Sequence, residues 1–242
     1  AAPQPGRASL RRQRPRTGHQ DMRRGHMITS YCAIGDSFSE GLGDPAPGGD
    51  PDQFRGWADR LAEHLTRSPI GSPELRYANL AIRGKTLDSI VGEQLDRALE
   101  LAPDLVSLVG GGNDCLRPRA DVDALSDQLE EAVMKLRSAG IRVLLGTGFD
   151  TRSLQMLRAV RGRVGIYNSN IWSIAQRHDL EVLDLWGIAD LHGPEHFAED
   201  RLHLAASGHE IVADEALAVL EHRPLPSHGH PAPVRPDWKC VV

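Results

Sequence analysis

The feature that most constrains the fold is an alternation of short apolar runs with segments of helical periodicity. Five apolar runs are each about the length of a β-strand, and each except the first follows a polar, helix-like segment. They cover residues 28–34, 75–82, 105–109, 141–145 and 180–185. Runs that are apolar throughout are typical of parallel strands that are covered on both faces.

Four segments between or after these runs place their apolar side chains on one helical face. They cover residues 54–65, 86–101, 122–136 and 205–220, and Gly140 is placed to end the third of them. This alternation predicts an α/β protein with three layers, in which helices cover both faces of a five-stranded, mainly parallel, flavodoxin-like sheet. Ligands of such sheets bind beyond the carboxyl ends of the strands, so reactive side chains should follow the apolar runs.

The two ends of the chain differ in composition from the part between them. Residues 1–26 carry seven arginines and one aspartate, a local charge of +6, and we expect them to form a disordered basic arm. Residues 223–242 contain five prolines and are expected to form a Pro-rich tail. The sequence therefore predicts a single folded domain over residues 27–222.

Charge and composition exclude several classes of protein. The chain beyond the arm has 21 basic and 32 acidic residues, so no basic face for nucleic acid is expected. No apolar run approaches the roughly 18 residues of a membrane-spanning helix. Because the start shown has no apolar secretory segment and the three cysteines are too scattered for a disulfide framework, we expect a cytoplasmic protein. The oligomeric state is left open.

Four polar motifs lie where the predicted sheet would carry a ligand site. Three follow apolar runs and the fourth precedes the last helical segment. They are GDSFS at 35–39, NLAIRG at 79–84, GGGND at 110–114 and DRLHLAASGH at 200–209. Each motif alone is compatible with an ordinary turn, whereas all four in this order indicate a common site.

The residue types in these motifs suit nucleophilic catalysis. A serine such as Ser37 needs a base to take its proton, and a histidine such as His203 is suited to do so near neutral pH. Asp200, three residues earlier, can hold the imidazole in one tautomer. The backbone N–H groups of Ser37 and Gly84 and the side-chain amide of Asn113 can donate to a developing oxyanion.

With these four motifs, residues 30–220 resemble the SGNH/GDSL hydrolase family. The resemblance implies an acyl-enzyme on Ser37, His203 as general base oriented by Asp200, and an oxyanion hole formed by Ser37, Gly84 and Asn113. The family usually has an aliphatic residue where this chain has Phe38. We therefore expect the acyl pocket of this chain to differ in shape from that of the family. The expected function is therefore hydrolysis of a carboxylic ester, without a metal ion or cofactor.

The family resemblance does not fix the substrate, since one scaffold serves several ester and thioester substrates. A thioesterase or a lysophospholipase remains an alternative. With few aromatic residues and no evident amphipathic lid, the sequence favours a small or soluble ester. Four further residues lie where they would shape a pocket, although core or surface roles are equally compatible with their positions. They are Leu42, Arg117, Phe149 and Trp186.

Other kinds of site fit the sequence less well. The α/β-hydrolase elbow G-x-S-x-G requires a second glycine that the motif at 35–39 lacks. His192 and His196 have the spacing of metal ligands on a helix, but a Gly-Pro pair separates them. A flavodoxin-like module whose loop at 110–112 binds phosphate is a further alternative, but it leaves Asp200 and His203 unexplained.

Overall fold

The structure is a computed structural model that describes residues 26–50, 52–153 and 155–226. The arm predicted at 1–26, except His26, and the tail predicted at 223–242, except residues 223–226, lie outside this description. Within the described ranges, no helix combines the length and the apolar character that crossing a lipid bilayer requires.

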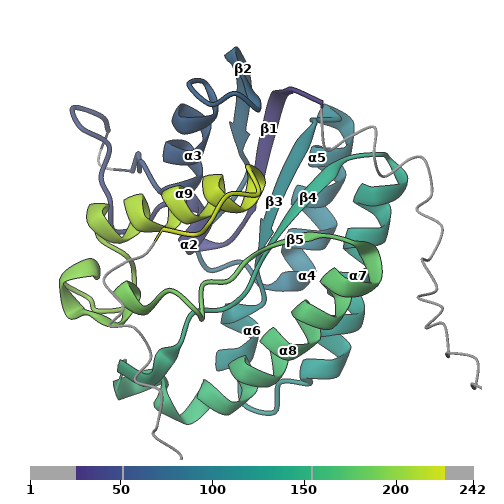
Figure 1. Cartoon of the computed structure of the whole chain (residues 1–242). Coiled ribbons are helices and arrows are strands. Elements are labelled where there is room, and N and C mark those ends of the chain that lie inside the picture. The colour runs from purple at the N-terminus through teal and green to yellow at the C-terminus, as the bar shows by residue number, and fades with distance from the viewer. Residues whose placement is uncertain (1–25, 51, 154, 227–242) are drawn as a thin grey trace, which may run out of the picture.

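Five parallel strands form the central sheet, in the order β2-β1-β3-β4-β5 (Figure 1). The strands are β1 (Ile28–Gly35), β2 (Gly71–Asn79), β3 (Leu105–Val109), β4 (Arg142–Gly146) and β5 (Glu181–Leu183). This order is that of flavodoxin-like sheets, so the predicted fold class is confirmed. The chain leaves β1 toward β2 on one side and returns to β3 on the other, so the switch point lies between β1 and β3.

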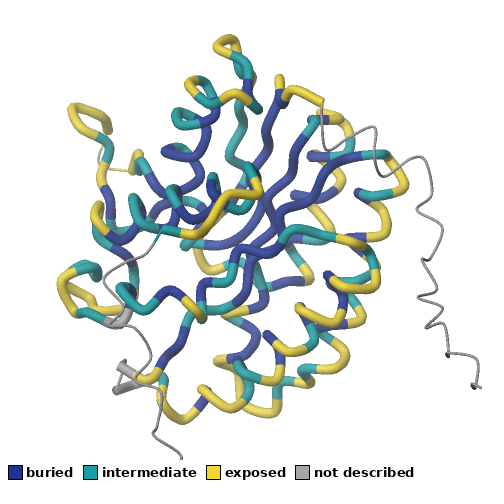
Figure 2. The backbone as a smooth tube through the Cα atoms, in the orientation of Figure 1, coloured by how far each residue is buried: buried dark blue, intermediate teal, exposed yellow. Residues whose placement is uncertain are grey.

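Helices cover both faces of the sheet, as predicted. One face carries α3 (Trp57–Leu65) and α9 (Ala206–Leu220), and the other carries α4 (Leu87–Ser89), α5 (Leu95–Leu101), α7 (Val122–Ser138) and α8 (Arg161–His178). Successive side chains of a strand point to opposite faces. In β1, Cys32 and Ile34 accordingly join the core under α5, α7 and α8, whereas Tyr31 and Ala33 join the core under α3 and α9. Figure 2 shows β1, β3 and β4 as the buried centre of the molecule, whereas the edge strand β2 is only partly buried.

The limits of α7 show how local sequence defines an element. Asp121 caps its first turn by accepting hydrogen bonds from the backbone N–H groups of Asp123 and Ala124, at 3.1 and 3.0 Å. Gly140, with φ of 76°, follows the last turn and donates its N–H to the Arg137 carbonyl. The helix end predicted at this glycine is confirmed.

Several elements differ from the sequence prediction, and β2 and the helix before β3 show this most clearly. Strand β2 begins at Gly71 rather than at residue 75, because Gly71 already pairs with Ile28 at the edge of the sheet. The helix predicted over 86–101 is divided into α4 and α5 by a π-helical turn, η1 (Ile90–Gln94). At the end of this turn, the Gln94 side chain accepts from the Gly35 N–H and donates to the Gly35 carbonyl, at 2.8 and 2.9 Å. The irregular turn therefore supports the end of β1.

Candidate active site

Ser37 lies just beyond the carboxyl end of β1, at the switch point between β1 and β3. It is the first residue of a short helix, α2 (Ser37–Glu40). The preceding Asp36 caps this helix, since its carboxylate accepts a hydrogen bond from the Phe38 N–H at 3.1 Å. A sharp passage from strand to helix thus presents the Ser37 hydroxyl at the edge of the sheet.

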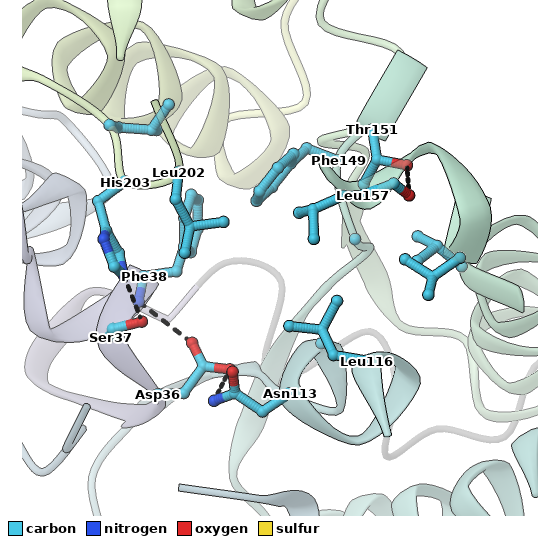
Figure 3. Close-up of a pocket in the computed structure, with 15 residues that line it drawn as sticks. Asp36, Ser37, Phe38, Asn113, Leu116, Phe149, Thr151, Leu157, Leu202 and His203 are labelled. Carbon is cyan, nitrogen blue, oxygen red and sulfur yellow. Dashed lines mark hydrogen bonds between the residues drawn. The ribbon is translucent and has the colours of Figure 1, made fainter. Parts of the chain in front are cut away.

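His203 points at Ser37 (Figure 3), and Asp200 contacts the other nitrogen of the His203 ring. The His203 Nε2 atom lies 3.1 Å from Ser37 Oγ, and its Nδ1 atom lies 2.6 Å from Asp200 Oδ2. The other Asp200 oxygen accepts from the backbone N–H groups of Leu202 and His203, at 2.9 and 3.0 Å. The structure therefore brings the three residues into one hydrogen-bonded chain.

The charge on Asp200 determines which nitrogen of His203 donates a hydrogen bond and which accepts one. Partial burial acts to raise the pKa of the Asp200 carboxyl, but hydrogen bonds from His203 and Leu202 outweigh it and hold the pKa below its ordinary value. A carboxylate only accepts hydrogen bonds, so the His203 proton lies on Nδ1. The Nε2 atom is then left to accept the proton of the Ser37 hydroxyl.

Gly84 lies in a loop, and the residues on either side of it, Arg83 and Lys85, form hydrogen bonds with other parts of the site. The Arg83 N–H donates to the Glu40 carboxylate of α2 at 2.7 Å, and the Lys85 carbonyl accepts from Asn113 Nδ2 at 2.9 Å. Gly84 itself has a φ of 74°, in the left-handed region that favours glycine. The loop thus joins the block that holds Ser37 to the block that holds Asn113.

Two other motif residues hold the loops rather than face the Ser37 hydroxyl. The Asn79 amide donates to the Ser39 carbonyl at 2.8 Å and accepts from the Ala81 N–H at 3.1 Å. Asp114 Oδ2 accepts from the Leu87 N–H at 2.8 Å. Both side chains satisfy backbone groups of loops that would otherwise be left without partners.

Asp36 is a residue of the site that has no role in the sequence-based prediction. Burial raises the pKa of its carboxyl to about 6. Its Oδ2 atom lies 3.5 Å from Asn113 Nδ2, so it faces the amide expected to bind an oxyanion. The Asp36 side chain is buried in the site, and its position in the sequence does not reveal this burial.

A cavity of about 120 Å³ opens beside Ser37, and its described lining is mostly apolar (Figure 3). Of the four residues considered from the sequence as pocket candidates, Phe149 lines this cavity, whereas Leu42, Arg117 and Trp186 are not in its lining. Trp186 instead lies beneath the guanidinium of Arg161, 5.1 Å from the ring centroid.

The two histidines that were weighed as metal ligands in the sequence, His192 and His196, lie in two separate short helices. His192 ends one short 3-10 helix, η4 (Ala189–His192), and His196 ends another, η5 (Pro194–His196). The two residues therefore do not share one helical face. The Nδ1 atom of His196 instead lies 3.1 Å from Ser207 Oγ.

Solved structures with a similar fold include three proteins of low sequence identity to this chain. An alpha/beta hydrolase enzyme from the metagenome of Lake Arreo, Spain, is 22% identical with a TM-score of 0.66, and the match covers 82% of this chain and 97% of that one. A variant acetyl xylan esterase from Geobacillus stearothermophilus is 20% identical with a TM-score of 0.67, over 84% and 100% of the two chains. TesA is 20% identical with a TM-score of 0.64, over 80% and 98%. These similarities support the fold.

Comparison of sequences adds the family. A search of curated proteins found no match to this chain. Residues 33–211 match the GDSL-like lipase/acylhydrolase family, and this range includes all four motifs found in the sequence. The resemblance to SGNH/GDSL hydrolases is thereby confirmed. The chain belongs to the GDSL-like lipase/acylhydrolase family and is an enzyme of the esterase type.

Proposed function

We propose that this protein is a serine ester hydrolase that forms an acyl-enzyme on Ser37. The observation that carries the proposal is the chain of hydrogen bonds from Asp200 through His203 to Ser37, with distances of 2.6 and 3.1 Å. Such a chain turns a weakly nucleophilic hydroxyl into a reactive one at neutral pH.

In the first half of the reaction, Ser37 Oγ attacks the ester carbonyl carbon while its proton passes to His203 Nε2. The tetrahedral intermediate then collapses, the bond to the leaving oxygen breaks, and His203 returns the proton to the departing alcohol. Asp200 stabilises the imidazolium that exists between these two transfers. The products of this half-reaction are the alcohol and the acyl-enzyme.

The negative charge on the carbonyl oxygen is held by the backbone N–H groups of Ser37 and Gly84 and by Asn113 Nδ2. The Asn113 amide has two hydrogens, and the Lys85 carbonyl accepts one of them at 2.9 Å. Among the residues that the structure describes, the second hydrogen has only the 3.5 Å contact with Asp36 Oδ2, which is at the limit of a hydrogen bond. This second hydrogen is the one available to the oxyanion.

In the second half of the reaction, water replaces the alcohol. His203 takes a proton from the water as the water oxygen attacks the acyl carbonyl carbon, and the proton then passes to Ser37 Oγ as the acyl bond breaks. The products are a carboxylic acid and the free enzyme. A thioester follows the same steps with sulfur in place of the leaving oxygen.

Steady-state hydrolysis of p-nitrophenyl esters tests the proposal directly. Replacing Ser37 by alanine should lower kcat by about 10⁴-fold or more, because the acyl-enzyme no longer forms. A matched control is Ser39→Ala, two residues away in α2. The Ser39 hydroxyl is buried and has no hydrogen-bond partner within the described part of the chain, so its removal should cost little stability or activity.

Activity retained in Ser37→Ala, at a level similar to Ser39→Ala, would contradict the proposal. Equal losses in both variants, with lowered melting temperatures, would indicate damage to α2 rather than loss of a nucleophile. A parallel assay with an acyl thioester of the same acyl chain compares the two leaving groups on the same enzyme.

A further inference from the structure

The cavity beside Ser37 is larger and more apolar than a short acyl group requires. Six of its apolar side chains come from three parts of the chain that lie far apart in sequence: Phe38, Leu116, and the segment that carries Phe149, Leu157, Val160 and Val164. The volume is about 120 Å³, whereas a site for one water molecule needs roughly 10–15 Å³. Because a methyl group is close to a water molecule in size, an acetyl group would leave most of this space unfilled.

The mouth of the cavity is apolar as well. Leu116 and Leu202 line the cavity and still expose 39% and 38% of their surface. Two leucines at a ligand-binding edge are positioned to cover an apolar chain that enters between them. A chain bound there would remove these side chains from water along with its own methylene groups.

The direction of the cavity distinguishes the acyl side of the ester from the alcohol side. His203 Nε2 must reach the leaving oxygen, so the alcohol departs on the side of His203. In Figure 3 the side chains of Leu116, Phe149 and Leu157 lie across the site from His203. The apolar space is therefore on the side available to the acyl chain.

A second cavity of about 70 Å³ lies next to the first. Phe38, Phe149 and Val164 line both cavities, so they stand between the two spaces. The Phe38 and Phe149 rings are held together, with centroids 6.3 Å apart. Cys115 and Leu185 line only the second cavity. The aromatic pair thus forms an end wall with further apolar space behind it.

We propose that the first cavity binds a medium-length, unbranched acyl chain and that Phe149 is the wall that limits its length. This inference rests on the proposed role of Ser37 and adds the class of acyl group to it. The contribution of Phe38 explains why an aromatic residue suits the position that follows the serine in this chain: its ring faces Phe149 across the end of the cavity.

Chain-length profiles test the inference. With p-nitrophenyl acetate, butyrate, hexanoate and octanoate, kcat/KM should rise by about fourfold for each buried methylene group until the wall is reached. A second series of acetates with lengthening alcohols should show no comparable rise. Both series are measured below the concentration at which the substrates aggregate.

Two variants with a matched control test whether the cavity causes the dependence of kcat/KM on acyl chain length. Phe149→Ala should shift the preferred acyl chain to a longer one, because it joins the two spaces. Val164→Phe should lower kcat/KM for hexanoate at least tenfold relative to kcat/KM for acetate, because it fills the space that a longer acyl chain would occupy. The control is Ile166→Phe, on the same helix but 55% exposed, which should leave the profile unchanged.

The outcomes separate this inference from the proposed function. Acetate hydrolysis that depends on Ser37, with no rise toward longer acyl chains, would overturn the inference and leave the serine mechanism intact. A rise in the alcohol series alone would assign the cavity to the leaving group and likewise overturn it. Absence of any Ser37-dependent hydrolysis would overturn both. If Val164→Phe does not fold, the Phe149→Ala profile decides, and an unchanged profile there contradicts the assignment.

Discussion

Asp200 uses its two carboxylate oxygens for different partners. One accepts from the backbone N–H groups of Leu202 and His203, and the other lies 2.6 Å from His203 Nδ1. An asparagine at this position can keep the first set of contacts through its amide oxygen. Its NH₂ group, however, would donate toward Nδ1 and favour the tautomer whose proton is on Nε2.

Asp200→Asn should therefore lower kcat by about 10²–10⁴-fold while the fold is kept, because His203 can no longer accept the Ser37 proton. The measurement is kcat on a p-nitrophenyl ester together with the melting temperature. Glu199→Gln is the matched control, since it removes an exposed carboxylate from the neighbouring position. Wild-type turnover in Asp200→Asn would show that the tautomer of His203 does not depend on this carboxylate.

Single residues also show what the sequence reveals about the site. Ser37, Asp200 and His203 could be found because reactive residue types follow predicted strands and because the last two are close in sequence. Phe149 could be named as a pocket candidate, but Asp36 and the rest of the cavity wall could not be found, since burial and cavity shape arise from segments that meet only in the folded chain. In the sequence, nothing distinguishes Val160 and Val164 from other apolar residues, and only the folded chain shows that they line the same cavity as Ser37.

At the scale of elements, the segment between β4 and α8 forms much of the cavity wall. It contains two 3-10 helices, η2 (Thr151–Ser153) and η3 (Gln155–Val160). Buried Asp150 anchors it by accepting from Arg161 Nε and Nη2, at 2.6 and 3.0 Å, and from Arg152 Nε at 2.5 Å. The wall is therefore fixed to the first turn of α8 through one carboxylate.

Asp150→Asn should lower the free energy of unfolding by about 1–3 kcal/mol at pH 7, because a charged acceptor of both arginines is lost. The Arg161 guanidinium holds the pKa of the Asp150 carboxyl well below its usual range. Its stabilisation is thus present above the unfolded pKa of about 3.9 and is lost as pH falls below it.

Denaturant unfolding at pH 7 and at pH 3 checks this prediction, with exposed Asp96→Asn as the control. The difference between wild type and Asp150→Asn should shrink at the lower pH. A difference that stays constant across this range would show that the carboxylate charge does not fix the wall.

Elements were predicted unevenly from the sequence. All five strands and α3, α7 and α9 followed from continuous apolar runs or clear helical faces, with ends displaced by a few residues. Only the general helical character of the segment before β5 was recognised, and the limits of α8 were not predicted. Its buried side includes Asn168, whose amide accepts from the Gly148 N–H and donates to the Gly148 carbonyl, at 2.8 Å each. A polar side chain in a buried position interrupts the apolar periodicity on which the prediction depends.

At the scale of the whole molecule, His209 connects two helices on one face of the sheet. It belongs to α9, and its Nδ1 atom accepts from the Trp57 N–H at the start of α3 at 3.2 Å. The side chain is fully buried, and burial lowers its pKa to about 4. Between about pH 4 and pH 6.5, the imidazole is therefore neutral in the folded protein but protonated in the unfolded chain.

The stabilisation from neutral His209 should be complete above the unfolded pKa of about 6.5 and should be lost as pH falls toward 4. The loss should amount to roughly 2–3 kcal/mol, from about 1.4 kcal/mol for each pKa unit. In His209→Asn, whose amide oxygen can accept from the Trp57 N–H, this part of the acid sensitivity should disappear.

Unfolding free energies of wild type and His209→Asn between pH 7 and pH 4 measure that difference. The comparison isolates His209 from Asp36, whose raised pKa acts in the opposite direction: the cost of burying its carboxylate is relieved as pH falls through about 6. Parallel pH curves for the two proteins would contradict the account of His209.

The central claim is that Ser37 is the nucleophile, and covalent labelling tests it most directly. Incubation with a fluorophosphonate, followed by digestion and mass spectrometry, should find one phosphonyl adduct on the peptide that contains Ser37. The same treatment of Ser37→Ala should give no adduct, and Ser39→Ala should be labelled as wild type is. An adduct at another residue, or labelling that persists in Ser37→Ala, would contradict the claim.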